Sequence, residues 1–216
     1  MGASVPVGQT VPMHRRLVLA SSSRYRAAML EDAGLSARID PPDIDERAWD
    51  DQLGPLGAAG LALELARRKA AAVAPRHDDA LVIAGDQVGV LRAGATEVML
   101  TKQPAPETAT AQLVSMAGTS HELVNGLVVV DTASGRRVEG IDRQVVTMRD
   151  FTEDEAREYV DRFAPFDSSG SYRLEDQARM APLAPFVTDV RGEHDSGVLG
   201  LPMPLLQRLL AEVGGA

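Results

Sequence analysis

Apolar runs alternate with amphipathic stretches along this chain of 216 residues. The most apolar run, at 80–91, reads Ala-Leu-Val-Ile-Ala-Gly-Asp-Gln-Val-Gly-Val-Leu and predicts a strand buried on both faces. Shorter segments at 17–20 and 37–40 predict two further strands. Residues 120–131 and 136–149 have an extended pattern and are joined by a Ser-Gly turn, which predicts a long antiparallel pair.

Helical patterns fall between the predicted strands. Glycines close two of them, and a Thr-x-x-Glu capping box opens another. The predicted helices span 27–33, 58–74, 105–117, 153–162 and 204–213. Strands and helices that alternate in this way predict an α/β fold, and we expect one domain over 17–216.

The first sixteen residues contain two prolines and two glycines and lack the continuous apolar core of a signal peptide. We therefore expect a disordered leader at 1–16. No stretch approaches the roughly 20 apolar residues that a membrane-spanning helix needs. The sequence accordingly predicts a cytoplasmic protein without a membrane partner.

One charged residue, Asp86, stands inside the apolar run at 80–91. A buried carboxylate is strongly disfavoured unless a cation, a lysine or a hydrogen-bonding cluster accompanies it. Gly85, directly before it, leaves room for a group to approach the backbone closely. Asp86 is therefore a candidate functional carboxylate, and the alternative is an aspartate that caps a turn at the strand end.

The net charge of −9 argues against a surface that binds duplex nucleic acid. An acidic protein that handles an anionic ligand must concentrate its cations locally. The chain has no cysteine, which excludes disulfides, thiolate nucleophiles and cysteine-based zinc sites. Oxygen ligands are then the expected way to hold a metal ion.

Candidate anion-binding groups follow the first predicted strand, where Ser21-Ser22-Ser23 runs into a helix with Arg24 and Arg26 in its first turn. Free N–H groups at a helix start favour an anion such as phosphate. The alternative is that Ser23 only caps the helix and the arginines are solvated. The acidic loop at 41–47 is likewise either a solvated face or a set of oxygen ligands.

A series of short motifs, each weak by itself, occurs in a specific order over about 17–210. Together they resemble the Maf family of nucleoside triphosphate pyrophosphatases. The motifs are Leu19-Ala20-Ser21-Ser22-Ser23-x-x-Arg26, Asp45-Glu46, Arg68-Lys69-Ala70, Gly85-Asp86-Gln87-Val88, Lys102-x-Pro104, Gly170-Ser171 and Gly200-Leu201-Pro202.

The resemblance implies an elongated mixed sheet flanked by helices, with two lobes around a nucleotide-binding cleft, and a homodimer. It also implies hydrolysis of a nucleoside triphosphate between the α and β phosphates, with a divalent cation such as Mg, Mn or Co. Carried over by position, Asp86 is the general base or a metal ligand, and Glu46 is a supporting carboxylate and metal ligand. Ser21, Arg26, Lys69 and Lys102 would hold the triphosphate, and Lys102 would also assist the chemistry.

Within the family, Asp86-Gln87 resembles the branch that acts on 7-methyl-GTP in the removal of modified nucleotides. Tyr25 would stack on the methylated purine, and Glu175 would accept hydrogen bonds from the guanine edge. The Lys102 loop carries one residue more than the family's Gly-Lys-Pro. A nucleotide-binding regulator of septum formation with little turnover therefore remains the alternative function.

Overall fold

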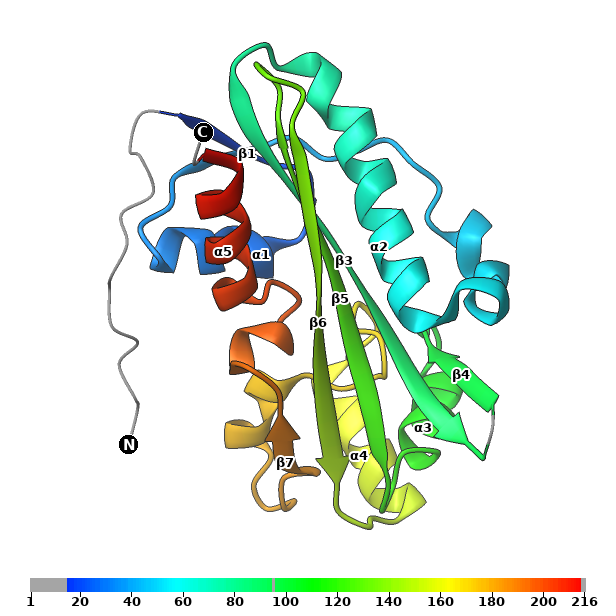
Figure 1. Cartoon of the computed structure of the whole chain (residues 1–216). Coiled ribbons are helices and arrows are strands. Elements are labelled where there is room, and N and C mark those ends of the chain that lie inside the picture. Colours follow the sequence, from blue (N-terminus) through cyan, green and yellow to red (C-terminus); the bar gives the residue numbers. More distant parts are fainter. Residues whose placement is uncertain (1–14, 95, 215–216) are drawn as a thin grey trace.

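The computed structural model describes residues 15–94 and 96–214. Its centre is a seven-stranded mixed sheet in the order β2-β1-β3-β5-β6-β7, with β4 paired to β3 (Figure 1). β1 is parallel to β2 and β3, and the remaining pairs are antiparallel. The strands are β1 (Arg16–Leu19), β2 (Ala37–Ile39), β3 (Ala80–Ala93), β4 (Thr96–Leu100), β5 (Ser120–Asp131), β6 (Arg137–Met148) and β7 (Val187–Arg191).

Five α-helices cover the two faces of this sheet in the described part of the chain (Figure 1). They are α1 (Arg24–Asp32), α2 (Leu53–Val73), α3 (Pro106–Val114), α4 (Glu153–Phe163) and α5 (Met203–Gly214). Short 3-10 helices occur at η1 (Arg47–Gln52), η2 (Ala74–Arg76), η3 (Leu174–Arg179) and η4 (Asp195–Gly197).

Alternate residues of β5 show which helices lie on which face. Val124 and Val128 pack in the clusters that contain α2. Leu127 and Val129 point to the opposite face, where they pack with α1 and α5, and Leu123 points to the same face but packs with α3 and α4. The long strands thus connect two core regions, one near each end of the sheet.

Local sequence explains the main helix boundaries. The Ser23 hydroxyl accepts a hydrogen bond from the N–H of Arg26 and caps α1. Thr152 and Glu155 form the predicted capping box of α4. Gly34 has a φ of 72° at the end of the α1 turn, a conformation that glycine adopts without steric cost.

The predicted α/β class, the mixed sheet and the long β5–β6 pair are confirmed. Other boundaries differ from the predictions. α1 begins at Arg24 rather than Ala27, and α2 begins at Leu53 with non-helical backbone at Gly57. β1 begins at Arg16, inside the range predicted as leader, and Arg15 is also described, whereas 1–14 lie outside the described residues. Among the residues described, no helix has the length and apolar character to span a membrane.

Candidate active site

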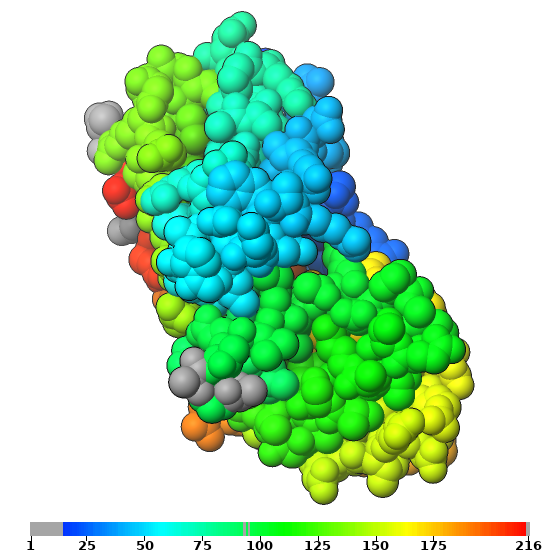
Figure 2. Space-filling view, turned by 90° about the vertical axis from the view of Figure 1, so that its right-hand side faces the viewer, coloured from blue at the N-terminus to red at the C-terminus, as the bar shows by residue number. Residues whose placement is uncertain are grey.

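A cleft of about 1140 Å³ opens between the two ends of the long sheet. In Figure 2 the segments coloured blue and cyan lie above the green segment around 100–120 and the yellow segment around 150–165. The cleft is lined from both sides, by residues of 21–26, 42–50, 61–69, 86–88, 99–104, 167–175 and 198–200. Its volume is slightly above the roughly 300 to 1,000 Å³ of typical small-molecule sites.

Asp86 lies in the middle of β3 with 6% of its surface exposed, and its side chain faces α2. The ammonium of Lys69, in α2, lies 2.6 Å from Asp86 Oδ1 and 2.9 Å from Glu46 Oε2. Burial raises the pKa of Asp86, while the positive charges of Lys69 and Arg26 act against that rise. The alternative interpretation of Asp86 as a turn cap is therefore wrong, and the predicted lysine partner is present.

A close approach of α2 to the sheet places Lys69 over Asp86. Gly126 pairs with Asp86 across β3 and β5, and a Cβ on Gly126 would lie 2.5 Å from the carbonyl carbon of Ala62. Ala62 and Lys69 are seven residues apart, which puts them on the same side of α2. The glycine lets the helix backbone touch the strand, so the lysine reaches a carboxylate in the middle of the sheet.

The Arg26 guanidinium is turned into the protein, and Arg26 is 8% exposed. Its Nη1 donates to the carbonyl of Gly85 at 2.8 Å and to Ser21 Oγ at 3.3 Å, and its Nε donates to the carbonyl of Gly200 at 2.8 Å. Burial lowers its pKa, while Asp86 and Glu46 oppose this. Arg26 thus ties β3 to the segment before α5, whereas the room predicted at Gly85 is taken mainly by the side chain of Leu127.

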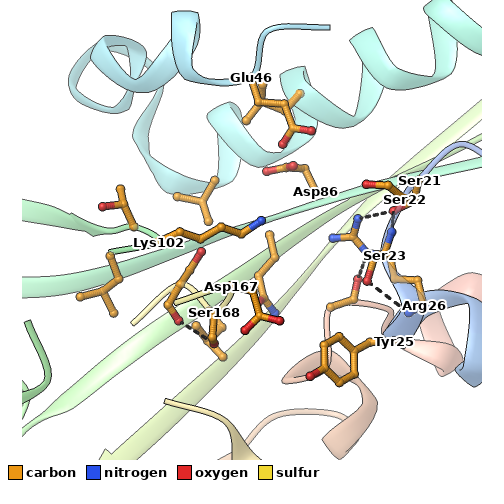
Figure 3. A pocket seen from close by; sticks show the side chains of 18 of the residues that line it. Ser21, Ser22, Ser23, Tyr25, Arg26, Glu46, Asp86, Lys102, Asp167 and Ser168 are labelled. Atoms are coloured by element: carbon orange, nitrogen blue, oxygen red, sulfur yellow. Dashed lines mark hydrogen bonds between the residues drawn. The ribbon is translucent and has the colours of Figure 1, made fainter. Parts of the chain in front are cut away.

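Lys102 differs from Lys69 because it is exposed, and Figure 3 shows its ammonium extending into the cleft toward Asp86. Its backbone forms a bridge with Ser169, which joins the lysine segment to the loop after α4. The chain contains no lysines besides Lys69 and Lys102, and both line the cleft. A compact ammonium is the usual point charge for phosphate, which makes Lys102 a candidate phosphate ligand in the cleft.

The predicted base-recognition residues also line the cleft. Tyr25 carries the Arg24 guanidinium over its ring, 5.1 Å from the centroid. Glu175 lies at the start of η3 and also lines the cleft. Gln87 projects to the face of β3 opposite Asp86, and its Nε2 is within hydrogen-bond distance of Asn125 Oδ1 and of the carbonyls of Gly197 and Val198.

Two further charged residues of the cleft, Asp167 and Arg173, were missed by the sequence analysis. Arg173 Nε donates to Asp167 Oδ1 at 3.1 Å, and Arg24 lies 3.7 Å from the other carboxylate oxygen. Asp167 occurs in the polar glycine-containing loop before Tyr172, but nothing in its spacing distinguishes it from a solvated charge. Only the fold brings it opposite Arg24.

The carboxylates that face one another from the start of η1 and from β3 are Glu46 and Asp86, joined by Lys69. No set of three or more histidine, cysteine, aspartate or glutamate side chains close enough for a metal ion occurs among residues 15–94 and 96–214. Mg²⁺ is commonly bound by one or two carboxylates together with substrate phosphates and water. The two carboxylates therefore fit a cation that enters with a phosphorylated ligand.

The family to which the chain belongs follows from its similarity to known proteins. Residues 16–213 match the family model described as Maf-like protein. The chain belongs to the Maf family. The predicted family membership is confirmed, and the elongated mixed sheet with its cleft is the architecture that the resemblance implied.

Named relatives of this Maf protein align over nearly its whole length. A nucleoside triphosphate pyrophosphatase of Streptomyces coelicolor is 39% identical, over 93% of this chain and 91% of its own. A dTTP/UTP pyrophosphatase of Desulforamulus reducens is 33% identical, with coverages of 93% and 97%. A 7-methyl-GTP pyrophosphatase of Nitrosococcus oceani is also 33% identical, with coverages of 94% and 96%.

Proposed function

We propose that this Maf protein hydrolyses 7-methyl-GTP to the monophosphate and pyrophosphate, with a divalent cation, in the removal of modified nucleotides. The general activity follows from the family match and from the names of the relatives. The chain is a nucleoside triphosphate pyrophosphatase, which is a hydrolase that acts on acid anhydrides. The base, the cation and the residue roles are our proposal.

The observation that carries the proposal is the buried Asp86, which is paired with Lys69 and toward which Lys102 extends in Figure 3. Hydrolysis adds water to the α-phosphorus and breaks its bond to the oxygen that bridges to the β-phosphorus. Asp86 accepts the proton of that water, because it is the buried carboxylate of the cleft. Lys102 stabilises the negative charge that develops on the departing pyrophosphate.

Asp86 and Glu46 would hold the cation, which supplies charge neutralisation for the phosphates when bound. In the free protein Lys69 occupies the space between both carboxylates and compensates their charge. Ser21 keeps its hydroxyl proton for a phosphate oxygen, since its oxygen already accepts from Arg26 and from the N–H of Ser23. Arg26 acts mainly by shaping the wall, because its Nε and Nη1 donate to protein carbonyls.

Preference for a methylated purine is supported by Tyr25 and Glu175, which both line the cleft. An aromatic ring attracts a cationic purine, and a carboxylate accepts both N–H groups of the guanine edge. Gln87 contributes its Oε1 to the ligand, because its Nε2 already serves three protein acceptors. Relatives of similar identity are named for 7-methyl-GTP and for dTTP/UTP, so the base has to be tested directly.

The test is pyrophosphate release from 7-methyl-GTP, GTP, UTP and dTTP, each with Mg, Mn and Co and with a chelator. We expect 7-methyl-GTP to have the highest kcat/KM and the chelator to abolish turnover. Glu175→Ala should lower kcat/KM for 7-methyl-GTP by about tenfold, the scale of one unpaired buried group, with little change for UTP. Glu158→Ala, an exposed glutamate of α4 outside the cleft, is the control.

A preference for UTP or dTTP, or an equal loss for every substrate in Glu175→Ala, would contradict the base assignment. Nucleotide binding without pyrophosphate release would favour the regulator of septum formation instead. We further propose that the protein acts as a cytoplasmic homodimer. Light scattering should then give twice the mass of one chain, and cell fractionation should recover the protein with the cytoplasm.

A further inference from the structure

A row of amides and a carboxylate crosses three strands on the face of the sheet opposite Asp86. Gln87, Asn125 and Asp142 are direct cross-strand neighbours in β3, β5 and β6. Asn125 has no exposed surface and Asp142 only 7%, and Gln144, also without exposed surface, completes the group. None of the last three lines the cleft, so they have no direct access to a nucleotide there.

The hydrogen bonds in this row converge on the carboxylate of Asp142. Asn125 Nδ2 donates to Asp142 Oδ2 at 3.0 Å, and Gln144 Nε2 donates to the same oxygen at 2.9 Å. A carboxylate only accepts, so Asp142 fixes which end of the Asn125 amide faces it. The Asn125 oxygen is then turned to Gln87, whose Nε2 donates to it at 3.1 Å.

The same amides hold the backbone that forms one wall of the cleft. Asn125 Nδ2 donates to the Gly197 carbonyl at 2.8 Å, and Gln87 Nε2 donates to the carbonyls of Gly197 and Val198 at 2.9 and 3.2 Å. Val198, Leu199 and Gly200 line the cleft. The Gly200 carbonyl accepts from Arg26, so the wall is joined to α1 as well.

Glycine at 197 is a steric requirement of this contact. A Cβ there would lie 2.3 Å from Gln144 Nε2 and 2.5 Å from Asp142 Oδ2. The segment therefore rests directly on the buried amides and the carboxylate. The hydrogen bonds from Gln87 and Asn125 to the carbonyls of this segment specify one position for the backbone above the network.

We propose that Asn125, Asp142 and Gln144 are positioning residues for the nucleotide cleft: they orient Gln87 and fix the 197–200 wall, and through it Arg26. The proposal rests on the proposed function, since its readout is nucleotide hydrolysis. Asp86 faces α2 on the other side of the sheet and does not belong to this network. The network therefore acts on how the nucleotide is held more than on the proton transfer.

The test uses the full chain with Asp142→Asn, Asn125→Asp and the double variant. Asp142→Asn keeps the shape but allows the Asn125 amide to rotate, and Asn125→Asp places a second carboxylate against Asp142 and against the Gly197 carbonyl. We expect KM for the nucleotide to rise by about tenfold in Asp142→Asn and by more in Asn125→Asp, which is the scale of one or more lost hydrogen bonds. The kcat of both variants should stay within about threefold of the wild-type value. In the double variant, the new amide at position 142 donates to the new carboxylate at position 125, so part of the KM loss should be recovered.

Asp131→Asn is the matched control, because Asp131 is equally buried in β5 but pairs with Arg15 away from the cleft. It should lower the melting temperature and leave KM unchanged. Thermal melts of each variant establish that kinetics are measured on folded protein. If Asp142→Asn is the only variant that folds, its KM is sufficient to test the positioning role.

An unchanged KM in folded Asp142→Asn, or no recovery in the double variant, would overturn the proposal. An equal KM rise in Asp131→Asn would also overturn it, because the effect would then be general destabilisation. Absence of hydrolysis by the wild-type protein is a different outcome, which would contradict the proposed function. In that case the dissociation constant of a non-hydrolysable triphosphate replaces KM as the readout for the network.

Discussion

At the scale of single residues, the site depends on Asp86, whose charge is opposed by burial and supported by Lys69. The buried carboxylate and its need for a partner follow from the apolar run around it. The identity of that partner does not, because Lys69 stands in a helix end where basic residues are favourable anyway. The distance of 2.6 Å comes from the packing of α2, which no local pattern encodes.

Replacing Asp86 by asparagine is the first prediction at this scale. If Asp86 accepts the proton of the attacking water, Asp86→Asn should lower kcat by at least about a hundredfold, the usual contribution of a general base. Pyrophosphate release and circular dichroism measure activity and folding. Asp131→Asn, a buried aspartate outside the cleft, should retain normal kcat. Near-normal hydrolysis by a folded Asp86→Asn protein would remove Asp86 from the mechanism.

The two lysines give a second prediction, because they are the chain's complete set and differ in burial. Lys69 is 5% exposed and ion-paired, whereas Lys102 is exposed. An amine-directed reagent should therefore modify Lys102 at least about ten times faster than Lys69, since burial and ion pairing restrict the access of the reagent to the Lys69 amine. Peptide mass spectrometry measures the two rates.

A nucleoside triphosphate should slow modification of Lys102. Protection by the monophosphate as strong as by the triphosphate would show that Lys102 contacts the base or the sugar instead.

At the scale of elements, the contact of α2 with β5 sets the geometry of the site. In Gly126→Ala the new Cβ would overlap the backbone at Ala62, so α2 must move away from the sheet. We expect a loss of about 1 to 3 kcal/mol in the free energy of unfolding, as for other overpacked sites, and reduced turnover because Lys69 moves with the helix. Urea denaturation and pyrophosphate release measure the two effects.

Gly54→Ala is the matched control for this helix, since nothing lies within 4 Å of a Cβ at Gly54. It should change the free energy of unfolding by less than about 1 kcal/mol, and in the stabilising direction, because alanine favours helix more than glycine does. Equal stability of the two variants would mean that α2 does not need its close approach to β5.

A second prediction for the elements concerns His121 in β5, whose Nε2 lies 2.8 Å from the Tyr172 hydroxyl of the loop after α4. Burial lowers the pKa of His121 to about 4 from the ordinary 6.5. Between these values the unfolded chain binds the proton more readily, so stability falls as the pH drops from about 6.5 to about 4. The loss from this group approaches about 3 kcal/mol at the lower end.

Urea unfolding at pH 7, 6, 5 and 4 measures this dependence. His121→Gln keeps a hydrogen-bonding side chain without a titratable ring, so its stability should decline less than that of the wild type over the same range. The carboxylates contribute equally to the pH dependence of the free energy of unfolding in both proteins. If the two proteins lose the same free energy of unfolding between pH 7 and pH 4, the prediction for His121 is wrong.

The predictability of the elements follows from the length of their patterns. The 80–91 run, the β5–β6 pair and the capped α4 were recognised because apolar spacing or capping residues persist over many positions. β7, with only five residues, and the short 3-10 helices have no such pattern and are fixed by contacts distant in sequence, as when Val187 pairs with Met148. The roles of Gly126 and Gly197 could not be predicted either, because they depend on groups distant in sequence that lie against these glycines.

At the scale of the whole molecule, the cleft lies where the two core regions meet along the sheet. Lys69 and Asp86 belong to the side covered by α2, whereas Tyr172 and Glu175 come from the region packed around α3 and α4. A nucleotide that spans the cleft touches both regions and binds only when both are folded. The motif series identified the family because its members come from both sides, although no single motif was specific.

Ligand-linked stability is the prediction that tests this arrangement. In folded Asp86→Asn protein, where turnover is suppressed, a triphosphate with Mg²⁺ at a hundred times its dissociation constant should raise the free energy of unfolding by about 2.7 kcal/mol. The monophosphate at the same concentration should stabilise less, because it lacks the phosphates that reach Lys102. Adding Lys102→Ala should remove most of that difference, and a triphosphate advantage that survives this change would place the phosphates on another part of the cleft.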